Sequence, residues 1–406
     1  MGQIQWVGMF ASLRHPSFRL LWTSTLLWST SRWMEIVVLG WLVLELTGSP
    51  FLVGLVTAMR GVPFLFFGAL GGVVADRVPS RTRLLAYAQS GIVALTLLLA
   101  ALVSTGLLQV WHLMVLAFLS GTAMAFDQPA RQTLVYDLVR EDLVNALAMN
   151  STAWNVARML GPAVAGVLLG WVGAGGCFAA MAVLQFVGVG SILLVGAPAR
   201  VNTSRVDSVW QNLKEGLSYA LHSPVPRTLL LVEAVTDIAA LPYIFVLMPV
   251  FARDVLSVGA TGLGFMTASA GIGALAGALT VAFIGDRLRK GLVTIISVLL
   301  FGLFLFLFSI TSWYPLALVL LALTGTFNTI QMNLEAVLLQ TTVPEEMRGR
   351  MIGAYVLTWG VMPVGNLQAG TVAALAGAPV AGAAGGIVLV LFALVLARFA
   401  GPLRRA

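Results

Sequence analysis

The sequence predicts an all-α integral membrane protein with twelve transmembrane helices. Of its 406 residues, 59% are apolar and only 10% are charged, whereas soluble proteins carry about 25% charged residues. A soluble fold of this length has too little interior to bury so much apolar surface, so lipid surrounds most of the chain. The composition excludes an ordinary soluble enzyme, a disordered chain and a disulfide scaffold.

Twelve apolar runs are long enough to cross a bilayer, because a spanning helix takes about 20 mostly apolar residues. In chain order these runs cover residues 18–45, 51–75, 83–104, 110–133, 147–170, 175–197, 227–251, 261–285, 291–311, 314–340, 351–375 and 379–400. Glycine and proline mark several of the breaks between runs. The runs are too long and too uniformly apolar for barrel strands, which alternate over about 10 residues.

The basic residues predict how the chain is oriented. If the N-terminus is inside, 19 of the 23 basic residues lie in cytoplasmic segments. The outer connectors hold only Arg253, while Arg32, Arg60 and Arg158 fall within spans. This asymmetry predicts that both termini are cytoplasmic. It also explains the net charge of +7 without any nucleic-acid partner.

Metal, disulfide and nucleotide chemistry have no sequence support. The single cysteine is Cys177, and the three histidines, His15, His112 and His222, lie far apart. These residues offer no ligand spacing for a metal. No Walker-type phosphate-binding motif is present, so ATP is not the direct energy source. We therefore expect no metal, no cofactor and no enzymatic activity.

An internal repeat predicts the domain organisation. A shift of 210 residues places Gly54, Thr57 and Ala58 on Gly264, Thr267 and Ala268. A shift of 204 residues places the Gly-Thr pair at 121–122 on the pair at 325–326. We expect two six-helix halves, 1–197 and 227–406, joined by a cytoplasmic linker, 198–226, with an amphipathic helix at 208–222. Such repeats are typical of transporters.

The connector after the second span resembles the loop signature of the major facilitator superfamily. In the segment 71–83, Gly72, Asp76, Arg77 and Arg81 match the signature, while the Pro-Ser pair at 79–80 departs from it. A shortened copy at 285–291 contains Asp286 and Arg287. The resemblance covers essentially the whole chain and implies the twelve-helix major facilitator fold.

The fifth span is similar to the antiporter motif of exporters in this superfamily. Gly161, Pro162 and Gly166 match the motif, and Ala165 replaces one of its glycines. The alternative is a generic close-packed helix, since small residues let helices approach. Segments 15–22, 41–50 and 126–150 are similar to the branch that holds the enterobactin exporter and macrolide-efflux proteins. This resemblance implies export driven by proton entry.

The resemblance also implies a cytoplasmic gate that breaks when the transporter opens inward. Its expected members are Asp76, Arg77 and Arg81, with Asp127 and Arg131 of the fourth span. A plain topology signal is the alternative for the arginines. Glu335 occupies the repeat position of Arg131, so we expect it to be a second cytoplasmic gate residue.

Six charged residues lie deeper in the spans, where charge is costly and usually functional. Arg32 and Glu35 are three residues apart and can pair on one helix face. Glu233 and Asp237 are four apart, and two such carboxylates in a low dielectric do not both stay charged at low cost. We therefore favour Asp237 and Glu35 as proton-coupling residues, with Glu233 next. A buried structural ion pair is the alternative for each of them.

The remaining deep residues are candidates for a substrate cavity. They comprise three arginines and two aromatic residues: Arg32, Arg60, Arg158, Trp33 and Tyr243. Aromatic residues of membrane proteins also simply face lipid or mark the interface.

Together these features predict an efflux pump that exchanges protons for a lipophilic drug or siderophore. A same-fold importer or facilitator of a small polar solute is the alternative, because the antiporter motif is incomplete. A membrane enzyme and a channel are disfavoured. The expected partners are the lipid bilayer, a small-molecule substrate and protons, but no nucleic acid. We expect a monomer in the bacterial inner membrane.

Overall fold

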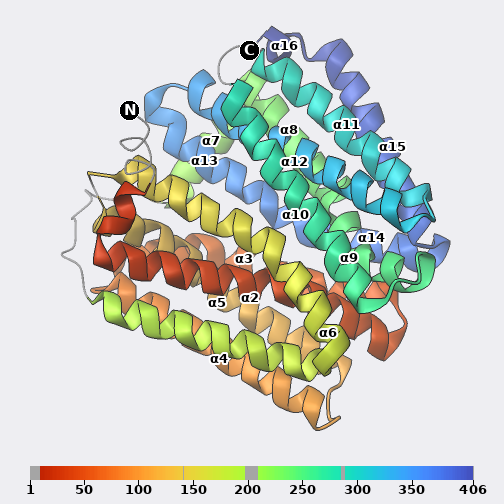
Figure 1. The fold of residues 1–406 in the computed structure, drawn as a ribbon. Helices are drawn as coiled ribbons and strands as arrows, with labels where there is room; N and C mark the ends of the chain where they lie inside the picture. The colour runs from red at the N-terminus through yellow and green to blue at the C-terminus, as the bar shows by residue number, and fades with distance from the viewer. Residues whose placement is uncertain (1–9, 140, 197–208, 285–288, 406) are drawn as a thin grey trace, which may run out of the picture. The chain divides into compact units, whose positions relative to one another are not determined.

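The computed structural model describes residues 10–139, 141–196, 209–284 and 289–405. Across these ranges every regular element is a helix. The first part of the chain forms η1 (Ala11–Arg14), α2 (Pro16–Thr47), α3 (Pro50–Arg77), α4 (Arg81–Ser104), α5 (Val110–Leu138) and α6 (Leu143–Val195) (Figure 1).

The second part of the chain begins with α7 (Val209–His222), α8 (Pro224–Ala239), α9 (Leu241–Val250) and the π-helix η2 (Phe251–Val255). It continues with α10 (Gly259–Ile284), α11 (Lys290–Ile310), α12 (Tyr314–Thr342) and α13 (Glu345–Thr358). The last elements are η3 (Trp359–Val361), α14 (Met362–Ala376), α15 (Ala378–Phe399) and α16 (Gly401–Arg405).

Nine helices of the described residues are long and apolar enough to cross a membrane. One of them, α6, has 53 residues and is two helices merged at Gly173, where φ is 67°. The nine helices therefore correspond to ten of the predicted runs. The other two predicted runs are α2, which carries Arg32 and Glu35, and the α13–α14 segment, which η3 interrupts.

The helices group into two compact units. Unit 1 consists of Met1–Leu42 and Met59–Arg205, and unit 2 consists of Val43–Ala58 and Val206–Ala406. The division at residues 205 and 206 falls within the predicted linker. The end of α2 and the start of α3 belong to unit 2, although the sequence places them in the first repeat.

In unit 1, α4 packs against α5 and α6. A buried apolar cluster joins α2, α4, α5 and α6 through residues such as Phe18, Leu85, Leu134 and Ile192. Burial of these side chains fixes the arrangement in which the polar residues of the unit meet.

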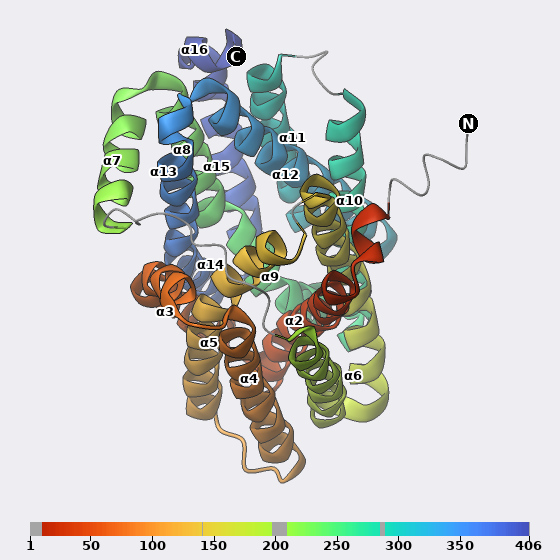
Figure 2. The ribbon, with the colours of Figure 1, turned by 90° about the vertical axis from the view of Figure 1, so that its left-hand side faces the viewer.

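In unit 2, α12 lies between α10 and α11, and α15 packs on α11 (Figure 1). The linker helix α7 packs on α13 and α8 (Figure 2). Glu215 of α7 forms an ion pair of 2.5 Å with Arg350 of α13. A Cβ on Gly216 would meet the Arg350 carbonyl, so glycine permits this close approach.

The two units share a matching helix contact that follows the sequence repeat. A Cβ on Gly121 of α5 would overlap the carbonyl oxygen of Arg60 in α3. A Cβ on Gly325 of α12 would overlap the carbonyl oxygen of Ala270 in α10. The glycines are 204 residues apart and their partners 210 apart, which are the two shifts that align the repeat.

Candidate functional site

Three buried carboxylates come together in unit 2. Glu233 and Asp237 lie one turn apart on α8, and Glu335 comes from α12. Their exposed fractions are 1%, 0% and 0%. Each of the three carboxylates interacts electrostatically with both of the others. The sequence predicted that Glu233 and Asp237 share a face, but the addition of Glu335 depends on how α12 packs against α8.

The carboxylate cluster has few partners. Trp359 Nε1 donates a hydrogen bond of 3.1 Å to Glu233 Oε1, and Tyr355 of α13 lies near Glu233 and Glu335. Both oxygens of Asp237 are buried without a hydrogen bond in the described structure, while Glu335 lies within reach of Gln331 and Glu233. None of the three carboxylates joins any ion pair among the residues described.

The α8–α9 break and α14 position the cluster. The helix α8 ends before Ala240, whose φ and ψ of −136° and −57° are not helical, and α9 begins at Leu241 with Pro242 in its first turn. A Cβ on Gly365 of α14 would meet the Asp237 carbonyl and the Pro242 ring. This close approach holds the last turn of α8, and therefore Asp237, against α14.

An arginine-rich cluster lies in unit 1. Arg60 Nη2 of α3 donates to Glu35 Oε2 of α2 at 2.8 Å and to the Met124 sulfur of α5 at 3.8 Å. Arg60, and not Arg32, therefore forms the ion pair of Glu35. Arg32 lies close enough to interact electrostatically with both residues. Arg158 of α6 stands over the Trp33 ring at 5.5 Å.

Several N–H groups of the arginine-rich cluster have no partner. Arg60 Nε, Arg60 Nη1 and Arg32 Nη1 are buried without a hydrogen-bond acceptor among the described residues. A buried guanidinium stays charged, since arginine does not lose its proton in proteins. Arg32, Arg60 and Glu35 together thus carry a formal charge of +1, and Arg158 adds a further cation at the Trp33 ring.

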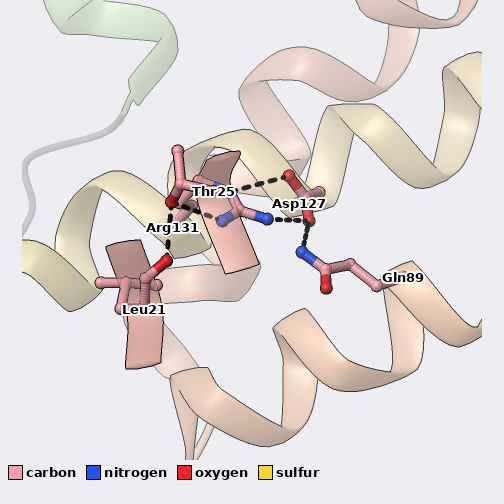
Figure 3. A network of polar contacts seen from close by, with 5 residues as sticks. All are labelled: Leu21, Thr25, Gln89, Asp127 and Arg131. Carbon is pink, nitrogen blue, oxygen red and sulfur yellow. Dashed lines mark hydrogen bonds and ion pairs between the residues drawn. The ribbon is translucent and has the colours of Figure 1, made fainter. Parts of the chain in front are cut away.

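Asp127 and Arg131 form the centre of a buried polar network (Figure 3). Gln89 Nε2 of α4 donates to Asp127 Oδ1 at 3.0 Å, and Arg131 Nη1 donates to Thr25 Oγ1 of α2 at 2.8 Å. Asp127 and Arg131 also pair with each other at 3.4 Å, one turn apart on α5. This network ties α2, α4 and α5 together.

The corresponding network in unit 2 is simpler. Gln331 stands at the repeat position of Asp127, and its Nε2 donates to Thr236 Oγ1 of α8 at 3.0 Å. Glu335 stands at the repeat position of Arg131, but it lies with Glu233 and Asp237 in the carboxylate cluster. A carboxylate therefore occupies the place where unit 1 has a cation.

The loop signature is only partly described. Arg81 Nη1 pairs with Asp137 of α5 at 2.6 Å, and its Nε donates to the Ala75 carbonyl at 3.2 Å. Arg77 is exposed. The side chain of Asp76 lies outside the described residues, as do Asp286 and Arg287 entirely.

The signature glycine Gly72 has open space where a Cβ would be. Its neighbour Gly71 packs instead, because a Cβ there would overlap the Ala125 carbonyl of α5.

The antiporter motif lies where α6 approaches α2. A Cβ on Gly161 would stand 2.8 Å from Trp33 Cβ and 2.9 Å from the Thr30 carbonyl oxygen. Pro162 and Gly166 are also buried. The motif therefore positions Trp33 and the helix segment that carries Arg32 and Glu35.

The aromatic cavity candidates are separated. Trp33 belongs to the arginine-rich cluster in unit 1, whereas Tyr243 lies on α9 in unit 2. Tyr243 is 2% exposed, and a Cβ on Gly385 of α15 would stand 2.7 Å from its ring. The structure thus packs Tyr243 tightly against α15.

Sequence reasoning missed four residues that complete these sites: Thr25, Gln89, Asp137 and Tyr355. Only Asp137 carried a usable signal, as a charged residue at the end of an apolar run. The others are ordinary polar or aromatic residues of spans, and only packing between distant helices reveals their partners.

Comparison with known proteins identifies the family. A family model described as transmembrane secretion effector (MFS_3) matches residues 7–406. The multidrug efflux pump Tap of Mycolicibacterium fortuitum is 27% identical over 363 residues, covering 85% of this chain and 86% of the pump. The enterobactin exporter EntS of Shigella boydii is 29% identical over 369 residues, covering 87% of this chain and 85% of the exporter.

A solved structure matches the fold as well. The crystal structure of a mutant nucleoside transporter NupG has a TM-score of 0.80 with 15% identity, covering 94% of this chain and 100% of that chain. At this identity the likeness concerns the fold alone. Together with the match along residues 7–406, it shows that the chain belongs to the transmembrane secretion effector family (MFS_3) and is a multi-pass membrane transporter of the major facilitator fold, not an enzyme.

Proposed function

We propose that the protein is a proton-coupled exporter that exchanges protons for a lipophilic small molecule, a drug or a siderophore. It crosses the bacterial inner membrane twelve times as a monomer, with both termini cytoplasmic. The similarity to Tap, a multidrug efflux pump, and to EntS, an enterobactin exporter, supports the direction of transport. The observation that carries the proposal is the buried carboxylate cluster of unit 2.

The physical argument rests on the cost of buried charge. A carboxylate taken out of water loses several kcal/mol of solvation unless a cation or hydrogen bonds replace it. Glu233, Asp237 and Glu335 interact with one another and form no ion pair among the described residues. Three such groups do not all remain charged, since repulsion and desolvation add. The cluster therefore holds at least one proton and releases it when its surroundings change.

The three residues have different parts in the proposal. Asp237 is the main proton carrier, since both of its oxygens are buried without a hydrogen bond in the described structure. Glu233 is second, because Trp359 already donates to one of its oxygens. Glu335 joins them, in addition to its expected place in a cytoplasmic gate. Glu35 differs from all three because it has a cationic partner, Arg60.

The gate proposal uses the networks of unit 1. The Asp127–Arg131 pair and the Arg81–Asp137 pair hold α2, α4 and α5 together in the state described. We propose that these contacts rearrange when the transporter alternates between its two open states. Asp76, Arg77, Asp286 and Arg287 join this gate through the sequence resemblance alone.

Proton release on ligand binding tests the proposal. Purified protein in weakly buffered detergent is mixed with erythromycin, enterobactin or rhodamine 6G while a pH-sensitive dye records free protons. Wild-type protein should release protons with at least one compound, because ligand and proton compete in an exchanger. Asp237→Asn should bind the same compound with release reduced at least tenfold.

The matched control is Asp254→Asn, because Asp254 is an exposed acidic residue of the same unit, paired with Arg253. This variant should release protons as the wild type does. A compound that binds every variant without proton release would remove the exchange mechanism. That result would favour the facilitator alternative.

A further inference from the structure

We propose that the arginine-rich cluster of unit 1 is an anion-binding subsite, and that the transported solute carries an anionic group next to a flat apolar ring. This inference rests on the proposed export function, because it names the class of solute exported. It concerns Arg32, Arg60, Arg158 and Glu35, which are members of unit 1.

The cluster contains more cations than carboxylates. Glu35 neutralises one guanidinium through the 2.8 Å ion pair with Arg60. Arg158 lies over the Trp33 ring at 5.5 Å, a contact that stabilises a cation without neutralising it. Arg32 has no carboxylate of its own among the residues described. The subsite lacks negative charge, and an incoming anion supplies it.

Several arginine N–H groups of the cluster lack a hydrogen-bond acceptor. Arg60 is 8% exposed, and two of its three guanidinium nitrogens have no acceptor in the described structure. Arg32 leaves Nη1 without an acceptor as well. A buried donor without an acceptor costs free energy. Carboxylates, phosphates and sulfonates are the acceptors that pair best with guanidinium groups, often through two parallel hydrogen bonds.

Apolar and aromatic side chains lie next to Arg60. Met124 contacts Arg60 and belongs to a buried cluster with Trp28 and Ile92, against which Phe64 and Trp154 pack. Trp28 and Trp154 meet edge to face with ring centroids 5.7 Å apart. Aromatic and thioether side chains bind flat apolar rings well. The neighbourhood therefore suits an aromatic anion better than a small inorganic one.

Two dyes with the same ring system and opposite charge test the inference. Fluorescein is an anionic xanthene and rhodamine 6G a cationic one, and both report binding to purified protein through fluorescence anisotropy. Protein-free micelles correct for partition into detergent. Wild-type protein should bind fluorescein at least tenfold more tightly than rhodamine 6G, because the subsite attracts anions.

Two substitutions should move fluorescein affinity in opposite directions. Arg32→Gln removes a cation without breaking the Glu35–Arg60 pair and should weaken binding about tenfold. Glu35→Gln leaves Arg60 without its carboxylate and should tighten binding several-fold. Arg83→Gln removes an exposed arginine of the same unit and should leave the fluorescein affinity unchanged.

Three results would overturn the inference. The first is tighter binding of rhodamine 6G than of fluorescein, and the second is binding of neither dye. The third is an Arg32→Gln variant that has the melting temperature of the wild type and binds fluorescein with unchanged affinity. Tighter rhodamine binding that Asp237→Asn abolishes would assign the solute to the carboxylates instead.

The inference and the proposed function fail separately. Fluorescein binding that depends on Arg32 but releases no protons would keep the subsite and remove proton exchange. Proton release by rhodamine 6G alone would keep exchange and remove the anion subsite.

Discussion

At the scale of single residues, the buried charges of the two units have opposite arrangements. Unit 1 contains ion pairs in which every carboxylate of the described sites meets an arginine, as in Glu35–Arg60 and Arg81–Asp137. Unit 2 gathers Glu233, Asp237 and Glu335 without a cation among the described residues. Paired charges hold helices together, whereas unpaired carboxylates need a proton or a ligand.

The Arg81–Asp137 pair gives a stability prediction. Both side chains are less than one-tenth exposed and their atoms approach to 2.6 Å. Asp137→Asn should lower stability by about 3 kcal/mol, since it removes the carboxylate that pairs with a buried guanidinium at 2.6 Å. The measurement is the melting temperature of the purified protein in detergent.

A second variant separates the charge effect from a general loss of packing. Arg81→Gln combined with Asp137→Asn should recover part of the loss, because the buried cation is removed together with the carboxylate that paired with it. A melting temperature of Asp137→Asn equal to that of the wild type would show that the pair does not hold α4 to α5.

At the scale of helices, glycine decides where two helices approach. Gly161→Val should destabilise the protein by at least about 2 kcal/mol, since overpacking a tight contact displaces backbone. Its Cβ would stand 2.8 Å from Trp33 Cβ, so α6 must move away from α2. Expression level and melting temperature measure the effect.

The control also lies in α6, after the break at Gly173. Gly190 has open space where a Cβ would be, so Gly190→Val should leave the melting temperature within a few degrees of the wild type. Equal effects of the two substitutions would contradict a special role for Gly161.

The repeat predicts matched effects at two distant glycines. Gly121→Ala and Gly325→Ala should each destabilise the protein by about 1 to 3 kcal/mol, because each added Cβ overlaps a neighbouring carbonyl oxygen. Gly91→Ala, which meets open space in α4, should be neutral or stabilising. A neutral Gly325→Ala beside a damaging Gly121→Ala would refute the match between the units.

The positions of the helices could be predicted from the sequence, because bilayer thickness sets the length of an apolar run. The break between the predicted runs 147–170 and 175–197 also lies where the sequence places it, because the two helices merged in α6 meet at Gly173. The interruption within the run 227–251 was harder. That run contains the α8–α9 break at Ala240, which has no turn-forming residue of its own. Local backbone geometry decided this point, not hydropathy.

The contacts between helices could be predicted least. The sequence suggested that Glu35 pairs with Arg32 on its own helix, whereas the ion pair forms with Arg60 on α3. It also gave no sign that Glu335, expected at a gate by the repeat, lies beside Glu233 and Asp237. Both differences arise because side chains far apart in sequence meet only after the helices pack.

At the scale of the whole molecule, the two units carry complementary chemistry in the proposed mechanism. Unit 2 carries carboxylates suited to protons, and unit 1 carries arginines suited to an anionic group. Transport by alternating access requires that binding at one site changes the other. Exchange of solute for protons follows if the proton leaves unit 2 when the solute is bound.

The direction of the pH gradient that drives transport is the most direct test of proton exchange. Proteoliposomes with an acidic interior are given an external solute that binds the purified protein, and its accumulation is compared with that in protein-free vesicles. We expect accumulation of the solute above equilibrium in vesicles with the wild-type protein, because protons leaving the vesicle drive the solute in. The Asp237→Asn variant should only equilibrate the solute. Accumulation driven by an acidic exterior, or indifferent to the pH gradient, would contradict proton exchange.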